Sequence, residues 1–328
     1  TAKIKDRLEN GQQVLLLQNR RGYSPVLLCP DCGWVPECRN CDIALTYHKK
    51  SATLICHYCN LHETPPAVCP RCRSRNFLYP GVGTQKVEYY LKTAFPDCRY
   101  ERLDLDASRI RERAPRVLKQ FGEGQIQLLI GTQMIAKGLD FPNVTLVGVI
   151  NADLGLYLPD FRARERVFQL LYQVSGRAGR GDIQGEIIIQ TYNPQDFTIR
   201  CALQQNLAGF SNFELNERNP LNYPPFSRMA LIQISDLNNQ RAATTAAAVA
   251  DFLNAHRGKI ELLGPAVAPL ARLLNRYRYQ IILKSRREKD PNGRILRQLL
   301  SNFLNSREYR NLSRQARITI DIDPLDLL

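Results

Sequence analysis

The sequence predicts an α/β fold class with a parallel sheet, an inserted cysteine-rich zinc domain, and a C-terminal α+β domain. Three observations support this. Apolar strand-like runs alternate with helical patterns over residues 83–206, eight of the ten cysteines lie within residues 29–72, and a proline-rich stretch at 219–228 separates these regions from a β-α-β-β-α-β pattern. Alternating helices and wholly apolar strands are typical of a parallel sheet covered on both faces.

The amino-terminal region reads as part of a larger sheet that the cysteine-rich segment interrupts. A short helix and a buried strand are followed by an apolar strand that runs directly into Cys29, and "NFLYPG" after Cys72 reads as a returning strand. The predicted elements are a helix over residues 2–10 and strands over residues 14–18, 26–28 and 76–81. The segment at 29–76 is therefore expected to be an insertion.

The central region alternates regularly between helix and strand. Helices are predicted over residues 83–95, 110–121, 164–174 and 194–206, and strands over residues 100–106, 126–132, 144–153 and 185–192. In the first helix, Val87, Tyr90, Leu91 and Phe95 lie on one face and are expected to pack on the sheet. Loops at the carboxyl ends of such strands are where sites form.

The cysteines form four Cys-x-x-Cys pairs, a spacing that lets both thiolates of a pair meet one Zn²⁺ in a tight turn. Disulfides dominate in short secreted chains, whereas this chain is long and has only Cys98 and Cys201 outside the window. Eight thiolates complete two tetrahedral sites with no open position, so the sequence predicts two structural zinc ions and no metal catalysis.

The pairing of the pairs follows from the intervals between them. Fourteen residues separate Cys41 from Cys56, which is room for a hairpin, but only five separate Cys32 from Cys38. We therefore favour a nested arrangement and keep a cross-braced one (first pair with third, second with fourth) as the alternative. The nested sites are Cys29, Cys32, Cys69 and Cys72 for the first zinc and Cys38, Cys41, Cys56 and Cys59 for the second.

Composition favours a globular protein that binds a polyanion. The chain is 44% hydrophobic and 23% charged, with a net charge of +14 and a pI near 9.5. Nucleic acid is the first candidate partner, and a basic protein with no such partner is the alternative. No apolar run approaches the roughly 20 residues of a membrane span, so no membrane association is expected.

After residue 219, strands are predicted over residues 229–235, 260–263, 277–284 and 317–322, and helices over residues 239–256 and 292–305, in a ferredoxin-like order. Residues 271–317 hold 13 Lys and Arg against 3 Asp and Glu. Arg276, Tyr277 and Arg278 interleave basic and aromatic side chains, a combination suited to phosphates and stacked bases. A solvated basic face is the alternative.

Two glycine-containing loops are suited to phosphate chemistry. In "IGTQMIAKGLDFPNV", Gly138 permits close backbone approach, Thr132 offers a hydroxyl and Lys137 a charge. In "QVSGRAGRG", Arg177 and Arg180 lie three residues apart among glycines and can reach one anionic group, which guanidinium groups bind bidentately.

These two strings resemble motifs V and VI of superfamily 2 helicases. With the eight-cysteine insertion after "NRRGY", the whole chain resembles the carboxyl-terminal half of the PriA-type primosomal helicases, a bacterial replication-restart family. The resemblance implies a RecA-like helicase lobe 2 at residues 1–28 and 77–218, a zinc-binding insertion at 29–76, and a C-terminal domain for DNA and partners at 219–328. It agrees with the nested zinc pairing.

The resemblance also implies residue roles. Gln173, Arg177 and Arg180 match motif VI, which faces the ATP γ-phosphate, with Arg180 and then Arg177 as arginine-finger candidates. Thr132, Gly138 and Asp140 match motif V, which couples the DNA backbone to the nucleotide. The implied protein is a cytoplasmic, monomeric 3′–5′ DNA helicase that acts on single-stranded and forked DNA with single-stranded DNA-binding protein and other primosome proteins.

The chain lacks a G-x-x-x-x-G-K-[ST] phosphate loop and an acidic box for Mg²⁺. In the family both lie in the first lobe, so ATP and Mg²⁺ are expected only when that lobe is present, and this chain alone is expected to be inactive. The rival hypothesis is a non-enzymatic zinc-ribbon module that binds nucleic acid on an inert α/β scaffold, which has no need of Arg177 and Arg180.

Overall fold

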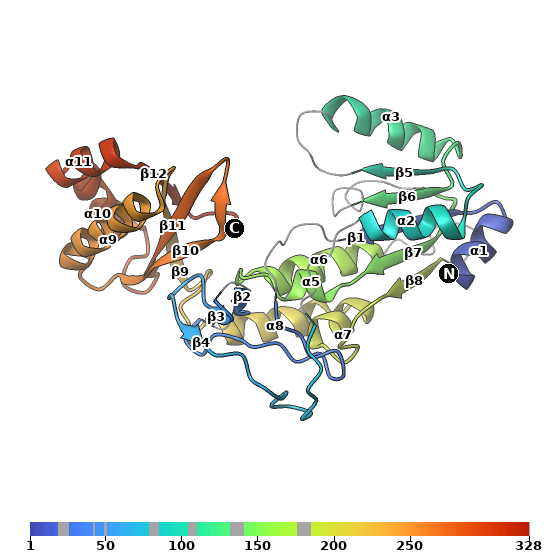
Figure 1. Ribbon diagram of the computed structural model, residues 1–328, viewed down its shortest axis with the longest axis horizontal. Helices are drawn as coiled ribbons and strands as arrows, with labels where there is room; N and C mark the ends of the chain where they lie inside the picture. The colour runs from blue at the N-terminus through green and yellow to red at the C-terminus, as the bar shows by residue number, and fades with distance from the viewer. Residues whose placement is uncertain are drawn as a thin grey trace.

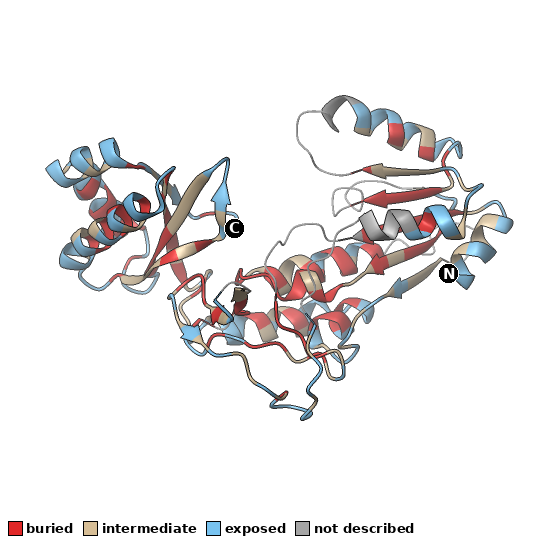
Figure 2. Ribbon diagram, viewed as in Figure 1, coloured by how far each residue is buried: buried red, intermediate tan, exposed pale blue. Residues whose placement is uncertain are grey.

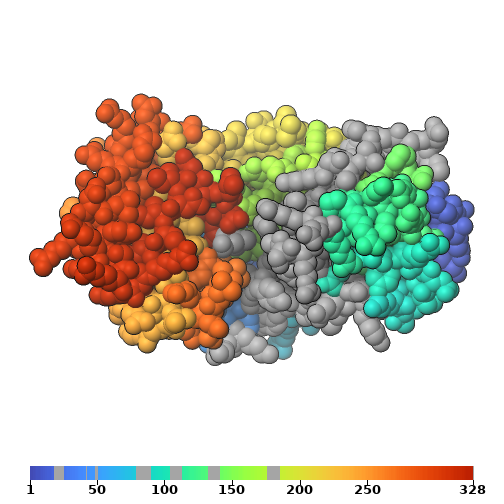
Figure 3. Space-filling model, turned by 90° about the horizontal axis from the view of Figure 1, so that it is seen from above, coloured from blue at the N-terminus to red at the C-terminus, as the bar shows by residue number. Residues whose placement is uncertain are grey.

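The structure is a computed structural model. It describes residues 1–18, 26–41, 43–48, 51–78, 85–103, 110–131, 141–175 and 185–327. An α/β sheet lies at one end of an elongated molecule and an antiparallel sheet with its helices at the other, and the cysteine-rich strands lie between them (Figure 1). Seen from above, the N-terminal residues and the C-terminal helices lie at opposite ends of the molecule (Figure 3), whereas the end of the chain lies near the middle (Figure 1).

The first sheet has five parallel strands in the order β5-β6-β1-β7-β8. Its strands are β1 (Gln13–Gln18), β5 (Tyr100–Leu103), β6 (Leu128–Gly131), β7 (Val144–Ile150) and β8 (Glu186–Ile189). The central strand, β1, pairs Leu15 with both Leu129 and Val147. The chain leaves the sheet after β1 and rejoins it at β5, so the cysteine-rich segment lies between two strands of one sheet.

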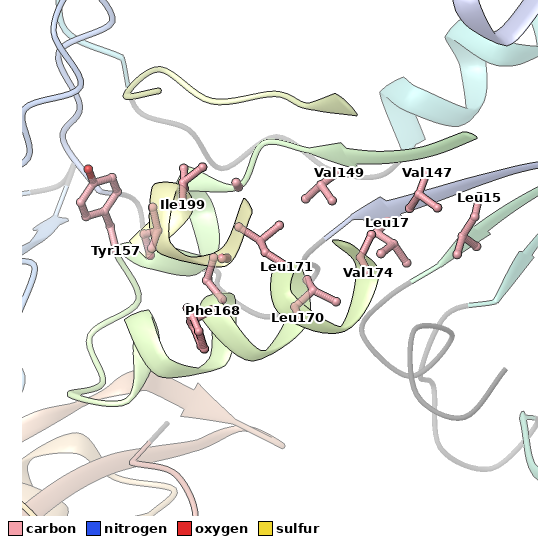
Figure 4. Packing of buried hydrophobic residues seen from close by; sticks show 14 of the residues in the cluster. Leu15, Leu17, Val147, Val149, Tyr157, Phe168, Leu170, Leu171, Val174 and Ile199 are labelled. Atoms are coloured by element: carbon pink, nitrogen blue, oxygen red, sulfur yellow. The ribbon is translucent and has the colours of Figure 1, made fainter. Parts of the chain in front are cut away.

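Alternate side chains of the parallel strands pack against helices on opposite faces. Leu15, Leu17 and Val149 share an apolar cluster with residues of α3, α6 and α7. Figure 4 shows the labelled side chains of β1 and β7 beside those of α6. Val14 and Leu16 meet α1 and α2 on the other face. The helices are α1 (Ala2–Glu9), α2 (Gln85–Ala94), α3 (Ile110–Gly122), α5 (Asp153–Leu156), α6 (Ala163–Ser175), α7 (Phe197–Leu203) and α8 (Leu207–Arg218).

Three local expectations differ from the structure. The helix predicted over residues 194–206 begins at Phe197, where Asp196 caps it, and it ends before Gln205, whose φ is +53°. A separate helix, α8, then starts behind the Asn206 cap. Tyr90 was expected on the buried face of α2 but is 53% exposed, whereas Leu91 is buried. The side-chain caps Asp196 and Asn206 therefore set where these two helices begin.

The C-terminal part is a four-stranded antiparallel sheet in the order β10-β11-β9-β12. Its elements are β9 (Ser227–Asp236), α9 (Asn239–His256), β10 (Glu261–Leu273), β11 (Arg276–Arg286), α10 (Arg294–Asn305), α11 (Arg307–Gln315) and β12 (Arg317–Ile322). The predicted ferredoxin-like order is confirmed, with α11 as an addition that the sequence pattern did not reveal. The predicted fold class is confirmed for the chain as a whole.

The two faces of this sheet have different neighbours. Ala230, Ile232 and Ile234 pack beneath the helices. Met229 and Leu231 point the other way and join a cluster with residues of the cysteine-rich segment. The helices therefore form the outer layer and the strands face the rest of the molecule, with buried residues along both (Figures 1 and 2).

Within the part of the chain that the structure describes, no helix combines the length and the apolar character that crossing a bilayer requires.

Asp290 anchors the start of α10 and provides a test of the C-terminal packing. Its buried carboxylate accepts hydrogen bonds from the amides of Ile295 and Leu296 and from the Ser285 hydroxyl. Burial alone would raise the pKa of Asp290, but these donors outweigh it and hold the pKa below its ordinary value.

We predict that Asp290→Ala lowers the free energy of unfolding by roughly 1–3 kcal/mol, because buried donors lose their acceptor. Since the folded-state pKa is depressed, the contribution is complete above the ordinary Asp pKa of about 3.9 and is lost as pH falls below it. Urea denaturation between pH 3 and 7 measures both effects. Glu288→Ala, an exposed carboxylate in the same loop, is the control, and equal losses for the two variants would contradict the prediction.

Candidate zinc centres and nucleic-acid surface

The first four-cysteine cluster joins the two ends of the cysteine-rich segment. The sulfur atoms of Cys29 and Cys72 lie 3.5 Å apart and those of Cys32 and Cys69 lie 3.7 Å apart. Each pair closes a tight turn, in which the amide of Gly33 donates to the carbonyl of Cys29 and that of Arg73 donates to the carbonyl of Cys69. We call these four residues the outer cluster.

The second cluster lies at the base of a small sheet formed by β2 (Thr46–His48), β3 (Thr53–Ile55) and β4 (His62–Glu63). It consists of Cys38, Cys41, Cys56 and Cys59, and the sulfur atoms of Cys38 and Cys59 are 3.6 Å apart. We call it the inner cluster. The cysteines are thus grouped in the nested arrangement rather than the cross-braced one.

The donor chemistry of both clusters fits zinc. In each, the four sulfur atoms lie within 4.8 Å of one another. Sulfur atoms at the corners of a tetrahedron with Zn–S bonds of about 2.3 Å are separated by about 3.8 Å, close to the distances seen here. A disulfide requires about 2.05 Å, so these thiols are not bonded to one another.

The inner thiols cannot all ionise without a compensating cation. Hydrogen bonds from Cys41 and Cys56 lower the pKa of the Cys38 thiol, and the same contact with Cys38 raises the pKa of the Cys41 thiol. The neighbouring thiols therefore stabilise one thiolate, at Cys38. Burial and the repulsion between negative charges oppose the ionisation of a second thiol. A divalent metal ion is what allows four thiolates to coexist in such a site.

The outer cluster abuts the parallel-sheet region. The Tyr157 hydroxyl donates to the carbonyl of Gly33, the residue that follows Cys32. Gly33 has a φ of +72°, and a Cβ at this position would lie only 2.5 Å from the Cβ of Asn193. Only glycine fits both the turn and the close approach. Cys72, on the other side of this cluster, is exposed.

The inner cluster contacts the C-terminal domain instead. The Tyr223 hydroxyl donates to the carbonyl of Cys41 over 2.8 Å. His57, beside Cys56, donates from Nδ1 to the carbonyl of Val267, and its own carbonyl accepts from the Gln280 amide. Burial lowers the pKa of His57 to about 4, so its ring is neutral at pH 7.

Around these bonds lies one apolar cluster built from all three parts of the molecule. It joins Leu54 and Tyr58 of the cysteine-rich segment to Phe161 from the loop before α6 and to Tyr223 and Leu231. The rings of Phe161 and Tyr223 stack at 4.7 Å. Trp34 packs at the edge of the same cluster, which supports a role in covering the cysteine core.

Sequence reasoning did not identify His57, Tyr223 and Gln280 as junction residues. His57 could have been suspected because a histidine between two zinc-type cysteines has a fixed position. Tyr223 and Gln280 carry no such signal, since they act only through a fold that brings them to the inner cluster from more than 160 residues away.

Most of the residues predicted in the two glycine-containing loops, for the nucleotide or for DNA, lie outside the described residues. These are Thr132, Lys137, Gly138, Asp140, Arg177 and Arg180. Gln173 is described, and it is exposed in the last turns of α6.

The basic and aromatic side chains of β11 alternate between the faces of the sheet. Arg276 and Arg278 lie on the face of Gln280, which points to the inner cluster, whereas Tyr277 and Tyr279 lie on the helix-covered face. Arg278 is half-buried and donates to the carbonyl of Leu270. The expected interleaved surface is therefore two surfaces, because successive strand residues point in opposite directions.

Comparison with known families matches three regions of the chain. Residues 72–182 match the helicase conserved C-terminal domain, residues 38–63 match the PriA DNA helicase Cys-rich region domain, and residues 219–325 match the primosomal protein N C-terminal domain. The chain thus has the carboxyl-terminal lobe of a helicase, with a cysteine-rich zinc region and a further domain.

Relatives identify the family. The chain is 42% identical over 98% of its length to the replication restart protein PriA of Bacillus subtilis, 38% identical over 99% to that of Haemophilus influenzae, and 44% identical over 83% to that of Synechocystis. The chain belongs to the PriA family of replication restart helicases, of which it represents the carboxyl-terminal portion. It spans 40%, 44% and 34% of the lengths of these three relatives.

Likeness to solved structures is weak by comparison. The helicase domain of Pyrococcus furiosus Hef shares 13% identity over 58% of this chain and 24% of its own length, with a TM-score of 0.26. The family assignment therefore rests on the sequence relatives.

The nested grouping makes a stoichiometric prediction. The purified, reduced chain is expected to hold about two zinc ions. Cys38→Ser in the inner cluster and Cys72→Ser in the outer cluster should each hold about one, because each site loses one of four ligands. Elemental analysis alongside protein quantification measures this. Cys98→Ser is the control and should keep both ions, and a chain with a single ion would contradict the prediction.

Proposed function

We propose that this chain is the second motor lobe, zinc region and C-terminal domain of an ATP-dependent 3′–5′ DNA helicase that recognises stalled or branched replication forks and reloads the primosome. Family membership and the joint presence of the three matched regions support the proposal. The observation that carries it is the string "QVSGRAGRG" after the helicase-type strands, at the position of motif VI.

We propose that the eight cysteines hold two structural zinc ions, the inner and outer clusters binding one each. Four thiolates leave no position for substrate water, so zinc would supply rigidity rather than Lewis-acid chemistry. Each ion would fix the two Cys-x-x-Cys turns of its cluster. One turn of the outer cluster places Gly33 against the helicase-type lobe, and one turn of the inner cluster places His57 against the C-terminal sheet.

In the proposed motor, Gln173, Arg177 and Arg180 face the γ-phosphate of an ATP held by the first lobe, and Thr132, Gly138 and Asp140 couple it to the DNA backbone. Mg²⁺ and the phosphate loop belong to that first lobe, so we propose that this chain alone does not hydrolyse ATP. Charge that builds on the phosphoryl oxygens is stabilised by arginines placed across the interface.

We propose single-stranded and forked DNA as the principal partner, with Lys137, Arg276, Tyr277 and Arg278 among the contacts. Single-stranded DNA-binding protein and other primosome proteins are proposed further partners, and the protein would act as a monomer in the bacterial cytoplasm. The charge distribution supports a polyanion. Of the 13 basic residues between 271 and 317, only Lys284 lies within salt-bridge distance of a carboxylate in the described structure.

The motif VI proposal is tested in a protein that carries both lobes. Arg180→Ala is expected to reduce DNA-stimulated ATP hydrolysis by roughly 10³-fold or more while DNA binding and zinc content are kept. Arg180→Lys should restore little, because a point charge does not reproduce the bidentate guanidinium.

Arg200→Ala, an exposed arginine on α7, is the control for loss of charge in the same lobe. Near-normal ATPase activity in both Arg177→Ala and Arg180→Ala would instead favour an inert scaffold that carries a zinc-ribbon nucleic-acid module.

DNA binding by this chain is expected to weaken steeply with salt, because phosphate contacts release counterions. Arg276→Ala should weaken binding to a single-stranded oligonucleotide and reduce the salt slope by about 1. Fluorescence anisotropy over a range of salt concentrations measures the slope. Lys259→Ala removes an equal charge at the opposite end of β10 and should leave the slope unchanged. Equal slopes for wild type and Arg276→Ala would count against this contact.

A further inference from the structure

The hairpin that joins β10 to β11 ends in an exposed apolar tip. Leu273 pairs with Arg276, so Leu274 and Asn275 form a two-residue turn. Leu274 is 87% exposed and Leu273 is 50% exposed. β9 ends beside the same turn, since Asp236 pairs with Tyr277, and the next residue, Leu237, is 61% exposed. We call Leu237, Leu273 and Leu274 the leucine tip.

Packing within the described chain does not explain why leucines occupy the leucine tip. None of its three residues belongs to a hydrophobic cluster of the fold. Leu274 and Asn275 have φ values of +49° and +60°, which define the type of turn that favours Asn-Gly or Asp-Gly. A leucine in the left-handed region costs conformational energy, and its exposure costs hydration. Such strain, where no packing compensates it, points to a function.

Cationic side chains frame the leucine tip. Arg272 and Arg276 flank the turn on its two strands, and neither has a carboxylate within salt-bridge distance among the described residues. The guanidinium of Arg272 lies 5.2 Å from the centre of the Tyr277 ring, which holds it beside the turn. The nearby Asp236 is already engaged by Arg241 through two nitrogen atoms. Apolar groups beside arginines that have no carboxylate within salt-bridge distance among the described residues match bases between phosphates.

We propose that the leucine tip packs against the outermost base pair of a DNA duplex where it joins single strands, with Arg272 and Arg276 on the flanking phosphates. The proposal rests on the DNA binding proposed above and assigns it a contact with the bases. A terminal base pair exposes an apolar face that no neighbour covers. Leucine side chains are among those that proteins wedge between base steps.

A fluorescent base reports this contact directly. The whole chain is mixed with a forked oligonucleotide that carries 2-aminopurine at the last paired position, and with a second one that carries it in mid-duplex. Wild type is expected to change the fluorescence at the junction and not in mid-duplex. Leu274→Gly should abolish most of that change and weaken fork binding roughly tenfold, since the buried apolar surface is lost.

Glycine adopts positive φ without strain, so Leu274→Gly should unfold at the same temperature as wild type or higher. Leu274→Met keeps an apolar side chain and should retain most of the fluorescence change. Leu304→Ser, which removes an exposed leucine from α10, is the matched control and should behave as wild type. Affinity of Leu274→Gly for unbranched single strands should stay within about twofold, because the arginines remain.

A wild-type fluorescence change in Leu274→Gly overturns the proposal while leaving DNA binding intact. Absence of salt-dependent DNA binding by wild type itself overturns the proposed function as well. Binding to phosphatidylglycerol vesicles is also measured for wild type and Leu274→Gly, since leucines among arginines suit an anionic membrane surface. Vesicle binding that depends on Leu274, with fork binding that does not, overturns the base contact in favour of a lipid one.

Discussion

The inner four-cysteine cluster is the constraint on which the arrangement of the molecule depends. It lies where three regions of the chain meet, and each makes a bond to its ligand turns or to the aromatic residues that cover them. Tyr223 reaches the Cys41 carbonyl, His57 bridges to both strands β10 and β11, and the Phe161 amide donates to the Tyr58 hydroxyl. A cysteine-rich segment with so little sheet of its own would gain much of its folding free energy from bound metal. We therefore propose that the position of the C-terminal domain depends on the state of this cluster.

The two clusters contact different regions of the molecule. The outer one faces the helicase-type lobe through Gly33, and the inner one faces the C-terminal sheet. A second connection runs from the end of the chain, where Arg162 and Arg166 donate to the carbonyls of Pro324 and Leu325 and the Leu327 amide donates to buried Asp160. Asp160 and Arg166 also form an ion pair at 3.0 Å. The loop before α6 therefore contacts both the cysteine-rich segment and the end of the C-terminal domain, and a movement of this loop would shift both.

The local sequence pattern predicted much of the fold because the periodicity of apolar residues and the spacing of cysteines depend only on residues close together in the chain. The strand over residues 317–322 and the helix over residues 239–256 have the predicted bounds, and the intervals between the cysteine pairs predicted the nested grouping. The features that were not predicted depend on contacts between distant residues or on a single capping residue. Asn206 caps the start of α8, a helix that the sequence pattern did not predict, and α11 was not predicted either. The arginines and tyrosines of β11 were predicted to form one surface because the composition of a segment does not show which way its side chains point. The two-residue period of a strand places them on opposite faces.

Small-angle X-ray scattering tests most directly whether the inner cluster holds the C-terminal domain against the lobe. The radius of gyration is compared for the zinc-loaded chain, for Cys56→Ser and for the outer-cluster variant Cys29→Ser, with circular dichroism reporting helix content. An increase for Cys56→Ser at unchanged helix content, larger than any for Cys29→Ser, is the expected result. Among the described residues, it is the turns of the inner cluster, at Cys41 and His57, that accept hydrogen bonds from the C-terminal domain. An unchanged radius for Cys56→Ser, in a sample that has lost the inner metal ion, would contradict the claim and would assign the docking to the contacts of residues 324–327.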